Sequence, residues 1–177
     1  MDDRAGVGVL YECLRALKTM RHHADVYCVA TVQEEVGVRG ATTSTYGIVP
    51  DVGIAIDVGF GDQASVPEYQ SISMDKGPGI SIGPAVHPAI HERLKSVAGE
   101  LEISVQVDPS PHPGGTDAFA IQIARAGIPT ALISIPLRYM HTAVETVCLT
   151  DIERAGRLLA EFIVRIDKKF VEGLKCF

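Results

Sequence analysis

The sequence predicts an α/β fold with three layers, in which a mixed, mainly parallel sheet has helices on both faces. Three short runs of mostly apolar residues, at 26–32, 52–56 and 130–135, are typical of strands that are buried on both faces. Segments with the apolar spacing of helices alternate with these runs, which is typical of β-α-β units. A length of 177 residues suits one domain with a sizeable core.

Four helices are expected. The first covers residues 7–20, where apolar side chains recur on one face, and two others cover residues 88–97 and 117–126. The last helix should begin at Thr150, because Thr150 and Glu153 have the spacing of a capping box. Its apolar stripe continues to Phe170 and should cover one face of the sheet.

Two shorter strands are expected at residues 80–82 and 103–107, which gives a sheet of five or six strands. Residues 59–79 are rich in Gly, Pro, Ser and Asp without a long periodic pattern, so they should form a surface excursion. No internal repeat or linker divides the chain.

Composition narrows the classes of function. Hydrophobic residues make up 46% and charged residues 21%, which excludes a disordered chain. Sixteen basic against 22 acidic residues, with no basic run, argue against nucleic acid as a partner.

No apolar stretch reaches the roughly 18 residues that cross a bilayer, and acidic residues follow Met1 where a secretory signal is basic, so a cytoplasmic location is expected. The four cysteines form no C-x-x-C pair, and we interpret them as reduced thiols, three of them in apolar segments.

Polar residues gather where the predicted strands end. The acidic pair follows the run at 26–32, an aspartate ends the run at 52–56, and a histidine follows the run at 130–135, while two aspartates precede the first helix. In open α/β sheets, ligands bind beyond the carboxyl ends of the strands. One edge of the sheet should therefore carry five carboxylates and one imidazole, from Asp2, Asp3, Glu34, Glu35, Asp57 and His141.

Carboxylates crowded into one cleft need cations, because like charges raise one another's pKa and cost stability. Oxygen ligands with one histidine suit zinc, cobalt or manganese, and a carboxylate can bridge two ions in a hydrolytic site. Neighbouring residues that leave a strand point in different directions. One of Glu34 and Glu35 can therefore coordinate a metal while the other acts as a general base.

Each of these residues also has an ordinary explanation. The first two aspartates can be an acidic segment favoured by a helix dipole, Asp57 can open a turn, and an isolated histidine is more often structural than a ligand. Arg138 can hold a substrate carboxylate or pair with an acidic residue at the edge. Thr116 and Asp117 can do no more than cap a helix.

Five motifs in order, spread over almost the whole chain, resemble those of metallopeptidase family forty-two, the tetrahedral and glutamyl aminopeptidases, some of whose members are labelled cellulases. The motifs are Asp2-Asp3-Arg4-Ala5-Gly6, Gln33-Glu34-Glu35-Val36-Gly37-Val38-Arg39-Gly40-Ala41, Ala55-Ile56-Asp57, Gly115-Thr116-Asp117-Ala118 and Arg138-Tyr139-Met140-His141-Thr142.

The resemblance implies a role for each position. Asp2 would bridge two metals, Glu35 and His141 would complete one site, and Asp57 would belong to the other. Glu34 would be the general base for a metal-activated water, and the peptide bond between the two aspartates should be cis. A peptide is the implied substrate, bound near Arg138, Gly115, Thr116 and Asp117.

The sequence departs from the family in one respect. The first metal-binding histidine of the family, the early strands and an inserted small β-rich domain that supports dimers and larger shells have no counterpart, so residues 1–177 are expected to be a partial catalytic domain. Counting ligands gives one firm metal site at Asp2, Glu35 and His141 and a weak or absent second site, with zinc or cobalt as the cation and His112 as a possible substitute ligand. Apolar sheet surface left bare should drive assembly into a homo-oligomer.

The leading interpretation is a metal-dependent aminopeptidase that removes N-terminal residues from peptides. A different class of function is a catalytically weak remnant that binds metal or partners without hydrolysis. Glycoside hydrolysis, suggested by the cellulase label, is less well supported, because glycosidases need two carboxyls that face each other across a sugar ring and rarely a transition metal.

Overall fold

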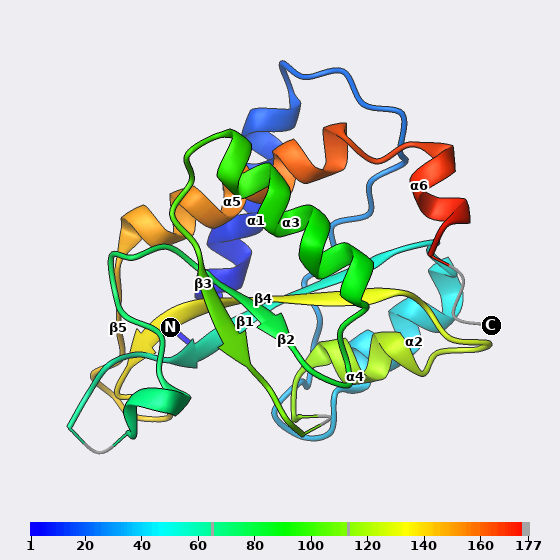
Figure 1. Cartoon of the computed structure of the whole chain (residues 1–177). Coiled ribbons are helices and arrows are strands. Elements are labelled where there is room, and N and C mark those ends of the chain that lie inside the picture. Colours follow the sequence, from blue (N-terminus) through cyan, green and yellow to red (C-terminus); the bar gives the residue numbers. More distant parts are fainter. Residues whose placement is uncertain (65, 113, 175–177) are drawn as a thin grey trace.

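The computed structural model describes residues 1–64, 66–112 and 114–174 and confirms the three-layer α/β fold (Figure 1). Its five-stranded sheet has the order β1 (Gly53–Phe60), β4 (Thr130–Arg138), β2 (Gly79–Ile82), β3 (Gln106–Pro109), and β5 (Thr146–Val147) pairs with β4 off this path. The pairs β1–β4 and β2–β3 are parallel, whereas β4 runs antiparallel to β2 and β5. The parallel ladders are the longer ones, so the sheet is mixed and mainly parallel.

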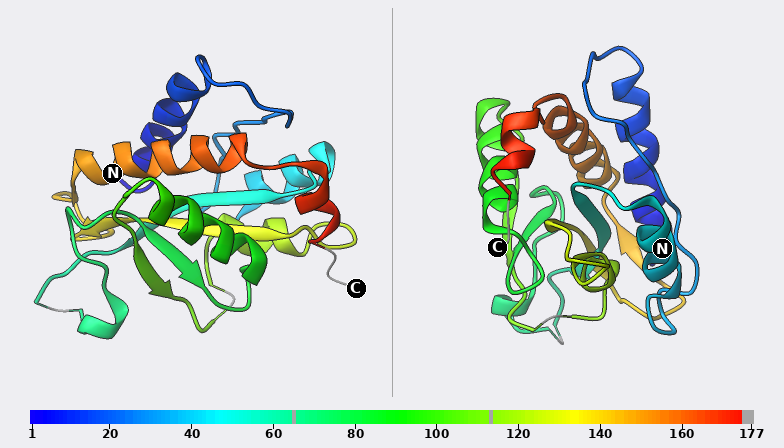
Figure 2. Two further views of the ribbon diagram at one scale, coloured as in Figure 1. Left: turned by 45° about the horizontal axis from the view of Figure 1, so that its top comes forward. Right: turned by 90° about the vertical axis from the view of Figure 1, so that its right-hand side faces the viewer.

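Helices cover both faces of the sheet (Figure 2). On one face, α5 (Leu149–Val164) packs against α1 (Arg4–Leu17), α3 (Pro88–Glu100) and β4. On the other face, α4 (Asp117–Gln122) packs against β1, β4 and α2 (Arg39–Ile48). A short 3-10 helix, η1 (Glu68–Gln70), follows β1, and α6 (Lys168–Glu172) follows α5, where Phe170 packs against Phe162. No helix among the described residues has the length and hydropathy of a membrane span.

The core is centred on β4. Every residue of β4 from Thr130 to Leu137 is buried, which explains why this strand reads as a continuous apolar run. Helices α5 and α3 supply further large core side chains, among them the fully buried Leu158 and Phe162 of α5 and Ile90 and Leu94 of α3. Strand β4 therefore lies at the centre of the core, with α5 and α3 packed against it.

The helices α1 and α5 cross closely at Gly156. A Cβ atom at Gly156 would lie 2.4 Å from the Cβ of Glu12 and 3.0 Å from the carbonyl oxygen of Val9. Only a glycine allows the backbones to approach to this distance. The packing of α1 against α5 thus depends on this residue.

The prediction of a strand at residues 26–32 is wrong. This segment forms no strand, and Tyr27, Cys28 and Val32 are exposed. The physical reason is that a strand needs a neighbour for its backbone groups, and none of the described strands pairs with the segment. Cys28 is therefore not in a buried strand, and Cys176 lies outside the described residues.

Several other boundaries differ from the prediction. Helix α5 begins at Leu149 after Cys148, without a side-chain cap, so the capping box at Thr150 does not form. The stripe towards Phe170 is divided between α5 and α6. Helix α2 was not predicted, because its sequence of small and hydroxylated residues has no strong apolar stripe. The strand at 103–107 is displaced to β3, and α4 ends earlier than predicted.

Candidate metal and catalytic site

Three of the predicted ligands lie together at one edge of the sheet. The Nε2 atom of His141 is 3.2 Å from Oδ2 of Asp2 and 3.7 Å from Oε2 of Glu35. One ligand atom from each of the three residues lies within 4.8 Å of the others. This spacing brings two carboxylates and one imidazole to a point that a single cation could occupy.

These three residues come from three separated segments. Asp2 directly precedes the residue that caps α1, Glu35 lies two residues after Gln33, and His141 lies three residues after the end of β4. Gln33 has φ of 60° and His141 has φ of 62°, left-handed values that non-glycine residues rarely adopt. The peptide bond between Asp2 and Asp3 is cis, as the resemblance implies. Left-handed φ values at non-glycine residues concentrate at functional sites.

Glu145 holds two of the ligand segments together. Its Oε2 accepts a hydrogen bond from the backbone N–H of Asp2 at 3.0 Å, and its Oε1 accepts one from the N–H of His141 at 2.9 Å. The Met1 ammonium, followed by the Asp2 amide, lowers the pKa of Glu145 to about 2. Sequence reasoning missed this residue, because a single glutamate in a loop carries no pattern that reveals such a role.

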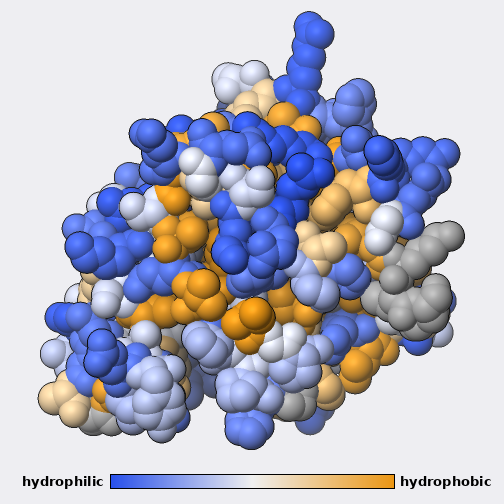
Figure 3. Space-filling view, in the orientation of Figure 1, coloured by the Kyte–Doolittle hydropathy of each residue, from blue (hydrophilic) through white to orange (hydrophobic). Residues whose placement is uncertain are grey.

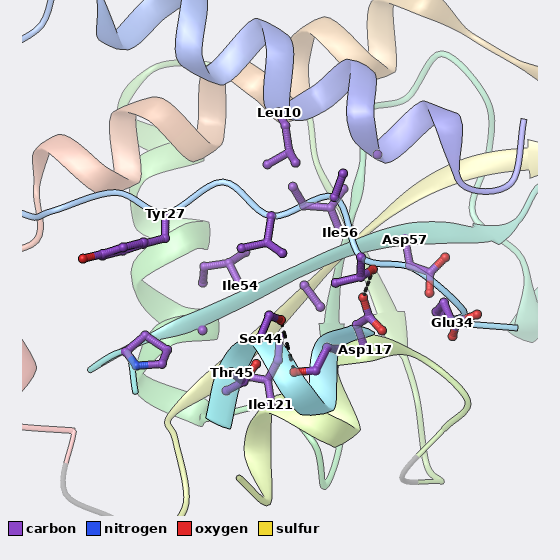
Figure 4. Close-up of a pocket in the computed structure, with 18 of the residues that line it drawn as sticks. Leu10, Tyr27, Glu34, Ser44, Thr45, Ile54, Ile56, Asp57, Asp117 and Ile121 are labelled. Atoms are coloured by element: carbon purple, nitrogen blue, oxygen red, sulfur yellow. Dashed lines mark hydrogen bonds between the residues drawn. The ribbon is translucent and has the colours of Figure 1, made fainter. Parts of the chain in front are cut away.

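A second group of carboxylates lines a neighbouring cavity of about 410 Å³ (Figure 4). Glu34 and Asp57 point into the space where Asp117 also lies, and Asp3 lines the same cavity. Asp57 lies within β1 and not at its end, because the strand continues to Phe60. Asp3 accepts a hydrogen bond from Gly6 N–H at 2.8 Å and so caps α1, a role that the sequence did not single out.

Crowding and burial raise the pKa values of these acids. Burial, and then the charges of Asp3, Glu34 and Asp2, raise the pKa of Asp57 to about 8 from an ordinary 3.8, although the Val58 amide opposes the shift. Burial raises the pKa of Asp3 to about 7. The pKa values of Glu34 and Asp2 are also raised, by burial first and next by the charge of Glu35.

The donor set fits a divalent cation. Oε1 of Glu34 and Oδ1 of Asp117 are buried and have no hydrogen-bond partner among the described residues. Within residues 1–64, 66–112 and 114–174, no Lys or Arg forms an ion pair with the acidic residues of the two groups. Buried acceptors without donors are costly, and a cation offsets that cost. One imidazole with carboxylate oxygens suits zinc, cobalt or manganese.

The other predicted site residues have different surroundings. The guanidinium of Arg138 donates hydrogen bonds to the carbonyl oxygen of Asp62 at 2.7 Å and to its carboxylate at 2.9 Å, so it pairs with an acidic residue. Asp117 accepts a hydrogen bond from the hydroxyl of Thr31 at 2.6 Å. Thr116 precedes α4 but makes no side-chain cap, and Gly115 is exposed.

The predicted substitute ligand His112 does not join the candidate metal group. It is exposed, and neither three-residue group of possible ligands in the described part of the chain includes it. The second of those groups contains Asp75, Cys148 and Asp151, about which the sequence suggested nothing.

Comparison with known proteins agrees with this geometry. Residues 1–158 match the family model described as M42 glutamyl aminopeptidase. The lysyl aminopeptidase of Pyrococcus furiosus is 41% identical over 175 residues, which are 99% of this chain and 48% of that protein.

Solved structures give the same result. An aminopeptidase from the archaeon Desulfurococcus kamchatkensis is 40% identical with a TM-score of 0.90, over 99% of this chain and 50% of that one. The TET1 peptidase of Pyrococcus horikoshii, described as assembling into a tetrahedron or a large octahedral shell, is 30% identical with a TM-score of 0.78, over 93% of this chain and 48% of that one. The chain spans about half the length of these relatives. By its sequence and its fold, the chain belongs to the M42 glutamyl aminopeptidase family.

Proposed function

We propose that the protein acts as a metal-dependent aminopeptidase that removes N-terminal residues from peptides. The observation that carries this proposal is the convergence of Asp2, Glu35 and His141 on one point, beside buried carboxylates that lack cationic partners. Membership of an aminopeptidase family supports it.

A zinc or cobalt ion would be held by Asp2, Glu35 and His141. Such a cation supplies Lewis-acid activation of water and of the scissile carbonyl. A second ion would have Asp57 and Asp2 as ligands, and two protein ligands give a weaker site than three. The expectation of one firm site and one weak or absent site is therefore part of the proposal.

Glu34 would serve as the general base. Its side chain points into the cavity beside Asp57, and burial raises its pKa, which favours a group that must first accept and later release a proton. In this role Glu34 takes a proton from the attacking water and returns it to the leaving amine. The unpartnered Oε1 of Glu34 leaves an acceptor available for that proton.

The substrate would be bound through its free amino group. Asp117 lines the cavity, its buried Oδ1 has no hydrogen-bond partner and it has no Lys or Arg partner among the described residues, so an ammonium group would find an acceptor there. A role for Arg138, Gly115 and Thr116 in peptide binding stays a prediction.

The proposal is tested by incubating the chain with aminoacyl chromogenic substrates in the presence of zinc or cobalt. Glu34→Gln should lower kcat at least ~100-fold while metal content stays unchanged, because a general base contributes about this much. The matched control is Glu92→Gln, an exposed glutamate on α3, which should leave kcat unchanged. Retained turnover in Glu34→Gln would remove Glu34 from its role.

A second candidate is a metal-binding remnant without peptidase activity. The observations that favour it are the single three-ligand group at this edge and the coverage of only half of the relatives. No turnover by the folded, metal-loaded chain would support the remnant and exclude the peptidase.

Assembly and organisation belong to the same proposal. We expect residues 1–177 to belong to a catalytic domain, and the chain to form a homo-oligomer in the cytoplasm. The assembly described for the Pyrococcus horikoshii peptidase supports the oligomer, and size-exclusion chromatography with light scattering would measure it.

A further inference from the structure

The loop that carries His141 joins β4 to β5 and lies at the surface. Residues 141–144 are exposed, and the side chains of Tyr139 and Val144 are 47% and 67% exposed. Figure 1 shows this loop on the same side of the molecule as the N-terminus. On the face in Figure 3, the apolar surface is broken into small groups that are separated by hydrophilic residues. Apolar packing therefore contributes little to the position of the loop, and hydrogen bonds have to determine it.

The imidazole of His141 has no polar partner besides the other two proposed ligands. Its Nε2 atom lies 3.2 Å from Asp2 and 3.7 Å from Glu35, and among the described residues its Nδ1 atom makes no hydrogen bond. Histidines that bind metals usually donate this second ring N–H to a carboxylate or a carbonyl, which fixes the direction of the ring. In this protein the direction of the ring therefore depends on the backbone of His141.

Glu145 supports that backbone. His141 has φ of 62°, a left-handed value that costs free energy in a non-glycine residue and persists only where the surroundings stabilise it. The Oε1 atom of Glu145 accepts the N–H of His141 at 2.9 Å. Glu145 directly precedes β5, where Thr146 pairs with Arg138 at the end of β4. The supporting carboxylate is thus attached to the sheet, whereas the histidine that it supports lies in the exposed loop.

The second oxygen of the same carboxylate fixes Asp2. Oε2 of Glu145 accepts the N–H of Asp2 at 3.0 Å, so one side chain holds the backbones of two residues whose own side chains lie 3.2 Å apart. An ionised carboxylate only accepts hydrogen bonds, so each of its oxygens can receive one amide. In the described part of the chain, Glu145 belongs to neither group of possible metal ligands, and its side chain is only 10% exposed. The spacing between Asp2 and His141 is therefore determined by a residue outside the ligand group.

We propose that Glu145 is a positioning residue of the metal site, which fixes the distance and direction between Asp2 and His141 before a cation binds. The inference rests on the proposed function, because it concerns the cation that we assign to Asp2, Glu35 and His141. Glu145 replaces the hydrogen-bond partner that the His141 ring lacks, and it acts on the backbone instead of the ring. Ligands that are already ordered bind a cation more tightly than ligands that the cation has to order.

A second contact in the same loop provides a matched comparison. Oε1 of Gln63 accepts the N–H of Tyr139 at 2.7 Å, which is also a bond from a backbone amide to a side-chain oxygen, two residues before His141. This bond anchors the loop to the segment after β1, which carries no proposed ligand. Loss of either bond should loosen the loop, whereas loss of the Glu145 carboxylate also releases Asp2.

The test compares Glu145→Gln with Gln63→Leu in cobalt binding, which requires no turnover. Glu145→Gln keeps the size of the side chain but leaves one acceptor oxygen, and its NH₂ group faces the other amide. This variant should lower the affinity for cobalt at least ~10-fold, the lower end of the effect of residues that orient metal ligands. It should also change the visible absorption spectrum of the cobalt-saturated chain, because that spectrum follows the ligand geometry. Gln63→Leu should lower the affinity less and keep the wild-type spectrum.

Two controls separate positioning from a general loss of stability. Urea unfolding of the metal-free chain should give similar losses for Glu145→Gln and Gln63→Leu, so stability alone does not account for a difference in cobalt binding. The Met1 ammonium also contacts Glu145, and N-terminal acetylation removes that charge but keeps the N–H. The effect of Glu145→Gln should persist in the acetylated chain, and its disappearance there would overturn the inference.

The outcomes distinguish this inference from the proposed function. If His141→Ala weakens cobalt binding but Glu145→Gln matches Gln63→Leu in affinity and spectrum, the inference fails and the proposed function stands. If the wild-type chain binds no cobalt, or if His141→Ala does not weaken binding, the proposed function fails and the inference fails with it. Should circular dichroism show that Glu145→Gln is unfolded, Glu145→Asp takes its place with the same expected result, because the shorter side chain keeps the charge but cannot reach both amides.

Discussion

Two acidic clusters in this molecule contain three possible metal ligands each, and they differ in how their charges are balanced. In the first, which consists of Asp2, Glu35 and His141, the neighbouring acids have raised pKa values and no Lys or Arg partner in the described part of the chain. In the second, which consists of Asp75, Cys148 and Asp151, the protein itself supplies hydrogen-bond donors to the buried carboxylate of Asp151.

The balance in the second cluster is provided by backbone and by one arginine. Asp151 is fully buried and accepts hydrogen bonds from the N–H groups of Asp75 at 2.7 Å and Gly77 at 2.8 Å. Arg154 adds a contact to Asp151 at 3.2 Å and pairs with Asp75 as well. The comparison teaches that proximity of ligand atoms does not distinguish a site from a structural clamp. What distinguishes the first cluster is that its acidic residues have no Lys or Arg partner among the described residues, which favours a cation there.

The largest expected effect concerns metal affinity. His141→Ala should lower the affinity for cobalt at least ~100-fold, because it removes one of three ligands. Asp75→Asn removes a carboxylate from the second cluster and should leave the affinity unchanged. Isothermal titration calorimetry measures both. If the two variants behaved in the opposite way, the assignment of site and clamp would be reversed.

The next effect concerns stability. Asp151→Asn should lower the free energy of unfolding of the metal-free chain by ~2–3 kcal/mol, because the amide leaves Arg154 and a backbone donor without a buried acceptor. Urea unfolding measures the change, with Asp75→Asn as an exposed control that should stay within ~0.5 kcal/mol. A neutral Asp151→Asn would show that the clamp contributes nothing.

The smallest expected effect is a pH dependence that belongs to the first cluster. Folding raises the pKa of Asp57 to about 8 and that of Asp3 to about 7, from ordinary values of 3.8, so the folded metal-free chain binds more protons than the unfolded chain between these limits. Stability therefore falls as pH rises from 5 to 8, by at least ~1 kcal/mol, or about 2–4 °C in Tm.

Calorimetry without metal measures this fall, and Asp57→Asn should flatten it. Bound cobalt should reduce it too, because the cation takes the place of the protons. A metal-free chain that became more stable as pH rose would contradict the assigned direction of the shifts.

The sequence predicted the elements whose apolar pattern directly reflects burial in the core. Burial on both faces made β4 recognisable. The positions of Asp2 before the first helix, of Glu35 after an apolar run and of His141 after β4 predicted that they share one edge, although the run before Glu35 forms no strand. The interpretation of residues 26–32 failed for a physical reason. Their apolar pattern indicates a strand, but strand formation depends on a neighbouring backbone that the described residues do not supply.

Residues that act through a few specific hydrogen bonds between distant segments could not be predicted. Glu145 joins the segments of Asp2 and His141 through two backbone amides, and Asp151 closes a loop in the same way. Neither residue belongs to a periodic pattern. Their roles follow from tertiary placement, which spacing along the chain does not encode.

Gly156, where α1 and α5 cross, affects the position of the candidate site although it lies far from the site along the chain. Any side chain at Gly156 would press on Glu12 and on the backbone at Val9, and α1 would have to slide or tilt to make room. Asp3 caps the first turn of α1 and Asp2 directly precedes it, so the displacement would reach Asp2, the metal ligand that we propose. The position of Asp2 thus depends on Gly156, a residue of α5, although α5 itself contributes no proposed ligand.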